Sequence, residues 1–310
     1  MRWVFLGSNG IRAGWGILLF ATVWLGLAQG AGWVLAPLLH FDPSRPIALP
    51  TGIVVELAQF LPVVIATGLL AFMERRTLLS YGFRGNARAL RLVCGLLWGF
   101  VAISALTLLL WKLGYLALTR GSLSAGAALE HAAGWGLAFL IAGFFEESLF
   151  RGYVQFTITR GIGFWWGTVL FSLIFAFEHT MNPGESLVGL ASVVAAGVIF
   201  SLSLWYTGSL WWAVGFHAAW DWGQSYFYGT PDSGMQAQSH LLNSHPAGPV
   251  LWSGGATGPE GSLLVLPTVL TIAVLMVLWW GRRVQSPFAG MAFRPPRRRP
   301  EVQPAIPADV

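Results

Sequence analysis

Two adjacent glutamates, Glu146 and Glu147, lie inside a run of apolar residues that is long enough to cross a membrane. A carboxylate within a membrane span costs free energy and is rarely found there without a functional role. Two apolar runs further along the chain each carry a histidine, His179 and His217. Ionisable groups on several separate spans predict one polar cavity inside a lipid-embedded protein, and this arrangement indicates chemistry performed in the membrane.

The composition also supports the membrane class. Of the 310 residues, 55% are hydrophobic and only 10% are charged, whereas soluble domains carry about 25% charged residues. Tryptophan pairs such as Trp165-Trp166 and Trp279-Trp280 end apolar runs, as in the aromatic belts at membrane interfaces. The net charge of +5 comes from basic residues at span ends, so it indicates contact with the lipid bilayer and no nucleic-acid partner. The single Cys94 excludes an intrachain disulfide.

We predict an all-α polytopic membrane protein with about eight transmembrane helices, because a span needs about 20 mostly apolar residues. The expected spans are Gly14–Leu35, Ile53–Met73, Leu92–Leu110, Ala133–Phe150, Ile162–Glu178, Leu187–Tyr206, Ser209–Tyr228 and Ser262–Trp280. Residues 1–132 would hold three spans, 133–228 a catalytic core of four, 229–261 an irregular extracytoplasmic loop, and 262–310 the eighth span and a basic cytoplasmic tail. The first apolar run is expected to be a retained helix, because no convincing cleavage site accompanies it.

The distribution of basic residues predicts the orientation in the cell membrane. With the N-terminus and C-terminus in the cytoplasm, 15 of the 18 Lys and Arg residues lie inside, and only Arg45, Lys112 and Arg120 lie outside. The triplet Arg297–Arg299 is expected to contact anionic headgroups. Arginine outnumbers lysine 17 to 1, a composition that favours a bacterial protein from a GC-rich genome.

The first candidate group consists of Glu146, Glu147 and Arg151. Glu147 and Arg151 are four residues apart, so they share one helix face in the favourable acid-first order, and their pairing would offset part of the cost of burial. Glu146 points about 100° away and is expected to act as a general base, since it has no partner on its own helix. The alternative is that both acids only fix helix packing.

The two histidines form the second group. Gly161 is expected to mark the turn between the fourth and fifth spans, which would place Glu146 and His179 at similar heights on antiparallel helices. They would then hold a water between them; the alternative for His179 is an interfacial residue. Asp221 lies four residues after His217 and is expected to orient its imidazole, although a pair that only pins the helix fits equally.

These residues resemble the three motifs of the type II CAAX prenyl protease family, also called CPBP or Abi-type intramembrane proteases. The motifs are Glu146-Glu147-x-x-x-Arg151, Phe175-x-x-x-His179 and His217-x-x-x-Asp221, and the run Thr207–Trp211 also resembles that family. The resemblance covers roughly 134–228, about a third of the chain.

The resemblance implies a glutamate-dependent intramembrane endopeptidase whose substrate is a peptide or protein at the membrane. Glu146 matches the glutamate that activates water, His179 the histidine that shares that water, and His217 the histidine that stabilises the oxyanion. Asp221 matches a position where eukaryotic relatives typically carry asparagine. An ionised Asp221 cannot donate to an oxyanion, so it must be protonated or orient His217. Glu147 and Arg151 match a supporting ion pair.

Several alternatives stay open at this stage. A zinc-dependent version of the protease would bind the ion through Glu146, His179 and His217, with one open position. We favour a site without cofactor or metal, because no His-Glu-x-x-His helix is present. A channel or proton-coupled transporter and a non-catalytic membrane scaffold are the other function classes, and the absence of an internal repeat disfavours the transporter.

Four further residues receive no catalytic role. Glu56 is expected to face the cavity or the outer interface, and Glu178 to support His179 or lie at the interface. His240 and His245 are expected to be solvated.

Overall fold

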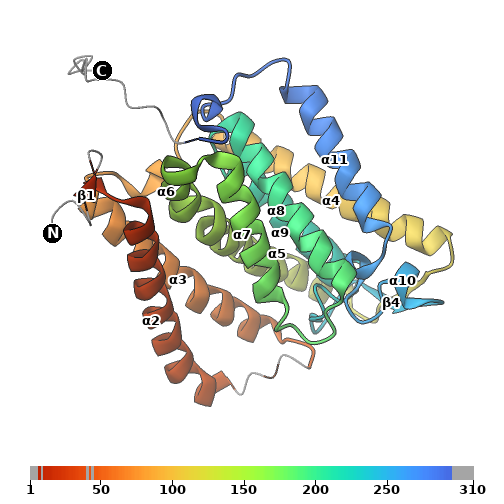
Figure 1. Cartoon of the computed structure of the whole chain (residues 1–310). Coiled ribbons are helices and arrows are strands. Elements are labelled where there is room, and N and C mark those ends of the chain that lie inside the picture. The colour runs from red at the N-terminus through yellow and green to blue at the C-terminus, as the bar shows by residue number, and fades with distance from the viewer. Residues whose placement is uncertain (1–5, 8–9, 40–41, 43–44, 295–310) are drawn as a thin grey trace.

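A computed structural model describes residues 6–7, 10–39, 42 and 45–294, so the predicted basic tail Arg297–Arg299 lies outside the described residues. The helices, given in chain order, are α2 (Ala13–Leu39), α3 (Leu49–Met73), α4 (Arg88–Lys112), α5 (Ala125–Glu147), α6 (Tyr153–Ile162), α7 (Phe164–His179), α8 (Leu187–Thr207), α9 (Trp211–Trp222), α10 (Val250–Ser253) and α11 (Val265–Trp280). Figure 1 shows α2 and α3 along one side of the bundle and α11 and α4 along the other. The prediction of an all-α polytopic membrane fold is confirmed.

Five described helices are long and apolar enough to cross a membrane: α2, α3, α4, α8 and the continuous run Ala125–Ile162. The other three predicted spans coincide with shorter helices, α7, α9 and α11. The chain continues past α9 through a π-helical turn, Gly223–Phe227, which lengthens that element. Many large apolar side chains point outward, including Phe72 and Leu278, and apolar surface of this extent marks contact with lipid or with another protein.

Helix α9, which carries His217, lies directly against α4 because glycines remove the side chains between them. A Cβ added to Gly99 of α4 would lie 2.1 Å from the Phe216 carbonyl oxygen, and one added to Gly215 of α9 would lie 2.3 Å from the Leu92 carbonyl oxygen. Small residues of this kind allow membrane helices to pack backbone to backbone. This contact fixes the position of α9, and therefore of His217, relative to the rest of the bundle.

The helix with the adjacent glutamates continues beyond the predicted fourth span. A π-helical turn, Ser148–Gly152, joins α5 to α6 and contains Arg151; such turns often occur at functional sites. The prediction of a turn at Gly161 is wrong, because α6 continues to Ile162 and the chain turns at Gly163. Gly163 has a φ of +102°, and a Cβ there would meet the backbone of Phe293 and Arg294, so glycine suits this position.

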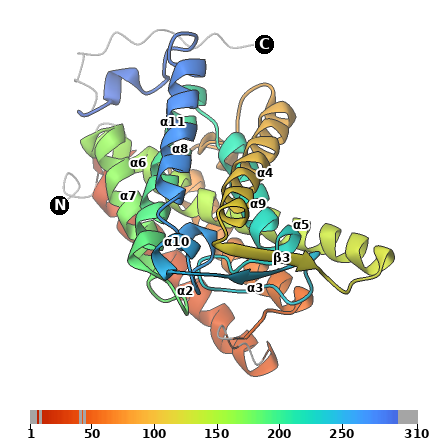
Figure 2. The same cartoon turned by 90° about the vertical axis from the view of Figure 1, so that its right-hand side faces the viewer.

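The segment 229–261 is more ordered than predicted. Its strand β4 (Leu242–Pro246) pairs antiparallel with β3 (Leu116–Arg120), which follows α4, and Figure 2 shows the two strands crossing one end of the helical bundle. The segment also contains α10 and the short 3-10 helix η4, Pro259–Gly261. The composition of β4 gives no strand signal, since its pairing depends on a partner more than a hundred residues away in the sequence. A second small sheet joins β1 (Leu6–Gly7) and β2 (Gly10–Ile11).

Candidate active site

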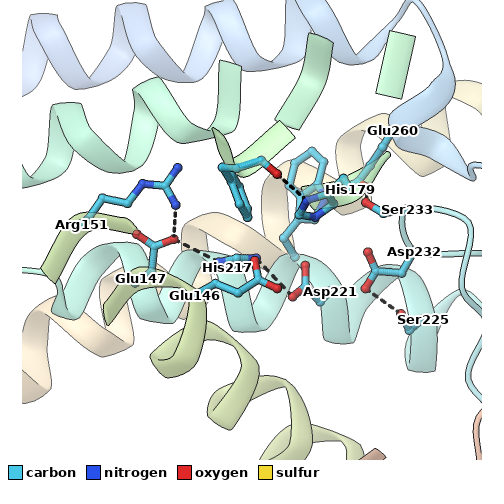
Figure 3. A network of polar contacts seen from close by, with 12 residues as sticks. Glu146, Glu147, Arg151, His179, His217, Asp221, Ser225, Asp232, Ser233 and Glu260 are labelled. Atoms are coloured by element: carbon cyan, nitrogen blue, oxygen red, sulfur yellow. Dashed lines mark hydrogen bonds and ion pairs between the residues drawn. The ribbon is translucent and has the colours of Figure 1, made fainter. Parts of the chain in front are cut away.

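A cluster of polar side chains lies inside the bundle, with His217 at its centre (Figure 3). Three carboxylates approach this imidazole. Its Nδ1 lies 3.2 Å from Oε1 of Glu147, and its Nε2 lies 3.4 Å from Oε2 of Glu146 and 3.6 Å from Oδ2 of Asp221. The structure therefore brings together residues that belong to two helices, α5 and α9, and that are about 70 positions apart in the sequence.

The predicted Glu147–Arg151 ion pair is present and fully buried. Nη1 of Arg151 donates to Oε1 of Glu147 over 3.2 Å, and the two side chains are 1% and 0% exposed. The same Oε1 atom also contacts His217. Glu147 therefore links the guanidinium to the imidazole, because one oxygen atom contacts both side chains.

Aromatic rings enclose the rest of the Arg151 guanidinium. Its central carbon lies 4.5 Å from the centroid of the Phe175 ring, with Phe150 and Phe200 at 5.6 and 5.5 Å. Such cation–π contacts stabilise a guanidinium away from water. Gly197 of α8 leaves the room that the side chain occupies, since a Cβ there would lie 2.6 Å from Nη2.

The orientation of His217 comes chiefly from Glu147 and Phe200. The imidazole stacks on the Phe200 ring, with centroids 5.0 Å apart and an interplanar angle of 21°. The carboxylate at Nδ1 belongs to Glu147, whereas Asp221 lies on the Nε2 side together with Glu146. The expectation that Asp221 orients the ring stays a prediction, because Asp221 lies 3.6 Å from Nε2 while Glu147 contacts Nδ1 from α5.

Glu146 differs from Glu147 in what surrounds it. Its side chain is 22% exposed, and among the described residues its buried Oε2 atom has no hydrogen-bond partner. The contact with His217 is too long for a strong hydrogen bond. This carboxylate therefore keeps a free lone pair directed toward His217, where a bound water could lie.

His179 ends α7 at the other side of the cluster. Its Nδ1 lies 2.8 Å from the backbone oxygen of Phe175, and because a carbonyl oxygen only accepts, Nδ1 must carry the proton. The lone pair of a neutral ring then lies on Nε2. His179 contacts the edge of the Phe175 ring, which also contacts His217, so the two histidines share one aromatic neighbour.

Two acids that received no role from the sequence extend the cluster, Asp232 and Glu260. Oε1 of Glu260 accepts from the Trp220 indole over 2.6 Å and Oε2 accepts from Ser233 over 2.8 Å. Asp232 accepts from Gln224 and from Ser225. Figure 3 shows both carboxylates at the same end of the cluster as Asp221 and His179.

Two cavities adjoin the cluster. A small apolar cavity of about 50 Å³ between α8, α9 and α11 is lined by His217, Asp221 and Glu260, which is room for a few water molecules. A second cavity of about 60 Å³ is lined by Glu56 and Asp232, in agreement with the expectation that Glu56 faces a cavity. His245 is exposed as expected, whereas His240 is only partly exposed.

The residues named for a zinc alternative are Glu146, His179 and His217. Within 6–7, 10–39, 42 and 45–294, no group of three or more His, Cys, Asp or Glu side chains has the arrangement that a metal ion needs. His179 directs Nδ1 to a backbone carbonyl, which leaves only Nε2 to bind an ion.

Comparison with known proteins gives one family. Residues 128–223 match the model of the family described as type II CAAX prenyl endopeptidase Rce1-like. No curated protein matches the chain. The matched segment contains all seven residues named in the three sequence motifs, from Glu146 to Asp221, whereas Glu56, Asp232 and Glu260 lie outside it. The segment 128–223, about a third of the chain, is thus similar to the CAAX protease family, which supports an Rce1-like membrane protease at the level of the family.

Proposed function

We propose that the protein hydrolyses a peptide bond of a membrane-associated substrate by a glutamate-dependent mechanism. The observation that carries this proposal is the pair of unlike glutamates. Glu147 is held by Arg151 and His217, whereas Glu146 is partly exposed and its Oε2 has no donor among the described side chains and backbone groups. A carboxylate of the second kind suits a general base.

In this mechanism Glu146 and Nε2 of His179 hold the attacking water. Glu146 takes one proton, and the water oxygen forms a bond to the scissile carbonyl carbon while the carbonyl π electrons move to the oxygen. The protonated Glu146 then gives its proton to the leaving nitrogen as the carbon–nitrogen bond breaks. The reaction consumes one water and yields a carboxyl and an amino end.

His217 is proposed to stabilise the oxyanion of the tetrahedral intermediate. An imidazolium donates from both nitrogens, so Nδ1 can donate to Glu147 while Nε2 donates to the oxyanion. Removing one such donor typically lowers kcat by about 10²–10³-fold. Asp221 lies beside Nε2 and is proposed to hold a positive charge on the ring, since an ionised carboxylate offers no proton of its own.

The decisive experiment compares Glu146→Gln with the wild type in detergent, using a peptide library. The amide keeps the shape of the side chain and removes the proton acceptor, so activity is expected to fall by about 10²–10⁴-fold. The matched control is Glu130→Gln, the same substitution at an exposed position on the same helix, which should retain activity. A Glu146→Gln protein that cleaves at the wild-type rate would exclude this mechanism.

We also propose that both termini face the cytoplasm, which places 229–261 outside. The test is labelling of intact cells with a membrane-impermeant thiol reagent, in a Cys94→Ser background. His245→Cys, exposed on β4, should react, and Asn86→Cys, exposed between α3 and α4, should not. The opposite pattern would invert the topology without affecting the proposed chemistry.

A further inference from the structure

The stretch of the chain from 161 to 281, which carries both histidines of the site, contains no basic side chain other than histidine. No Lys or Arg occurs from 161 to 281, yet five acids do: Glu178, Glu185, Asp221, Asp232 and Glu260. Among the described residues, the arginine that pairs with a buried acid of the site is Arg151, and its partner is Glu147. The acids at the opposite end of the cluster therefore depend on other partners.

Asp232 and Glu260 receive hydrogen bonds from neutral donors. Glu260 accepts from Trp220, the residue before Asp221, and from Ser233. Asp232 accepts from Gln224 and Ser225. These bonds orient the carboxyl groups but supply no positive charge to balance them when both are ionised, and like charges in a partly desolvated site repel one another.

A second observation indicates that this end lacks a hydrogen-bond donor. Gln224 is completely buried, and its Nε2 donates to Asp232, but its Oε1 has no partner in the part of the chain that the structure describes. A buried acceptor without a donor costs free energy, and a ligand rich in N–H groups would remove that cost.

The electrostatics of Asp232 agree with this interpretation. Burial, and then the negative charge of Glu260, raise the pKa of Asp232 to about 8. A carboxyl group whose pKa is raised in this way loses its proton when a cation binds beside it, because the cation offsets the repulsion between Asp232 and Glu260.

We propose that Asp232 and Glu260 bind a cationic group of the peptide substrate, a Lys or Arg side chain or a free α-amino group, close to the bond that is cleaved. The proposal rests on the proposed peptidase function. Glu260 lines the same cavity as His217 and Asp221, so a cation held there would lie beside the reacting atoms. Both acids lie beyond residue 223, outside the matched family segment, so this preference would belong to this chain's own loop.

The test uses pairs of acetylated fluorogenic peptides. The two peptides of a pair differ at one position, where one carries arginine and the other citrulline, and each position of the peptide is tested with its own pair. Citrulline has nearly the same shape as arginine but no charge. A third peptide carries a free amino terminus and no basic side chain, which distinguishes the two sources of the cation. At one position the wild type should show a higher kcat/KM for the charged peptide. Glu260→Gln and Asp232→Asn should each lower that ratio by about tenfold, a typical effect for a partly desolvated charge pair.

Glu130→Gln is the matched control, since it removes one exposed negative charge and should leave the ratio unchanged. A ratio near one at every position in the wild type, for arginine and for the free amine alike, would overturn the proposal. So would a Glu130→Gln protein whose ratio falls as much as that of Glu260→Gln, since the preference would then reflect overall charge.

A binding measurement separates this proposal from the peptidase function. Fluorescence anisotropy with the Glu146→Gln protein reports the affinity for the same labelled peptides without turnover. Tighter binding of the charged peptide, lost in Glu146→Gln/Glu260→Gln, supports the cation site even if no peptide is hydrolysed. If both peptides bind with equal affinity and are cleaved with equal kcat/KM, the peptidase function stands and the cation site is excluded.

Discussion

The two ends of the polar cluster balance their charges in different ways. At the Arg151 end, a guanidinium enclosed by three phenylalanine rings donates to Glu147, and both side chains are buried. At the Asp232 end, two carboxylates accept only neutral donors from tryptophan, serine and glutamine. The first end is complete within the protein, whereas the acids of the second have no Lys or Arg partner among the described residues, so a partner of positive charge could stabilise their ionised form.

This difference assigns different tasks to different parts of the chain. The Arg151 end lies in the segment that matches the protease family, and it holds His217 through Glu147. The two acids of the Asp232 end lie in 229–261, which the family match does not cover. A fixed set of groups for hydrolysis can therefore be combined with a loop that selects the substrate, because the two meet around His217, Trp220 and Asp221.

Breaking the Glu147–Arg151 ion pair should have the largest effect on stability and activity. Arg151→Ala leaves the buried Glu147 without its arginine, and breaking a buried pair on one side costs about 3–5 kcal/mol. We expect a marked loss of thermal stability, measured by the unfolding temperature in detergent, together with loss of peptidase activity because His217 loses its fixed neighbour.

Two variants control this result. Arg151→Ala/Glu147→Gln should recover much of the stability, since no unpaired charge remains, but not the activity. Arg160→Ala removes an arginine that pairs with Glu74, but Arg76, Tyr81 and Tyr153 still contact that carboxylate, so it should lower the stability less than Arg151→Ala does. Equal stability of Arg151→Ala and wild type would show that the buried pair does not hold this end together.

The parts of the site that the sequence predicted are those set by local helix geometry. Glu147 and Arg151, and likewise His217 and Asp221, are four residues apart, and a helix places such residues on one face. The helical, membrane-embedded fold follows from apolar runs in the same way. Both inferences use only the residues within one turn or one span.

The parts that could not be predicted depend on how helices cross. The contact of Glu147 with His217 joins α5 to α9, and nothing local distinguishes it from the expected contact of Asp221 with the same ring. Asp232 and Glu260 lie in a segment rich in glycine, proline and serine, where no periodicity indicates their direction. The lack of Lys and Arg from 161 to 281 is the one sequence signal for an excess of negative charge.

Removing the ionisable group of Asp232 should have a smaller effect, which is a pH-dependent change in stability. The pKa of Asp232 is about 8 in the folded protein and near 3.8 in the unfolded chain. Between these values the folded state binds the extra proton, so the free energy of unfolding falls as the pH rises through this window. Asp232→Asn cannot ionise, and its unfolding temperature relative to wild type should therefore increase from pH 5 to pH 9.

The titratable groups around Asp232 stay the same in that comparison. They are Glu260 from η4, Glu56 from α3, and His217 and Asp221 from α9. The amide can also keep its hydrogen bonds, because the unpaired Oε1 of Gln224 can accept from Asn after rotation of the glutamine amide. A difference in unfolding temperature that is the same at pH 5 and pH 9 would show that the charge of Asp232 is not the source of the effect.

Removal of metal should have the smallest effect, and it tests whether the difference between the two ends is real. A zinc ion bound by Glu146, His179 and His217 would add positive charge beside Asp221 and make a substrate cation unnecessary. It would also supply activated water, since zinc brings the pKa of bound water to about 7.

We propose instead that Glu146 takes the proton from water itself, so exhaustive dialysis against a strong chelator should leave peptidase activity and the preference for charged peptides largely intact. Elemental analysis should find well below one zinc per chain, with the Glu146→Gln protein as the control for residual hydrolysis. Loss of activity on chelation that stoichiometric zinc restores would overturn the metal-free mechanism, and loss of the charge preference in the zinc-loaded protein alone would show that the ion neutralises the acidic end.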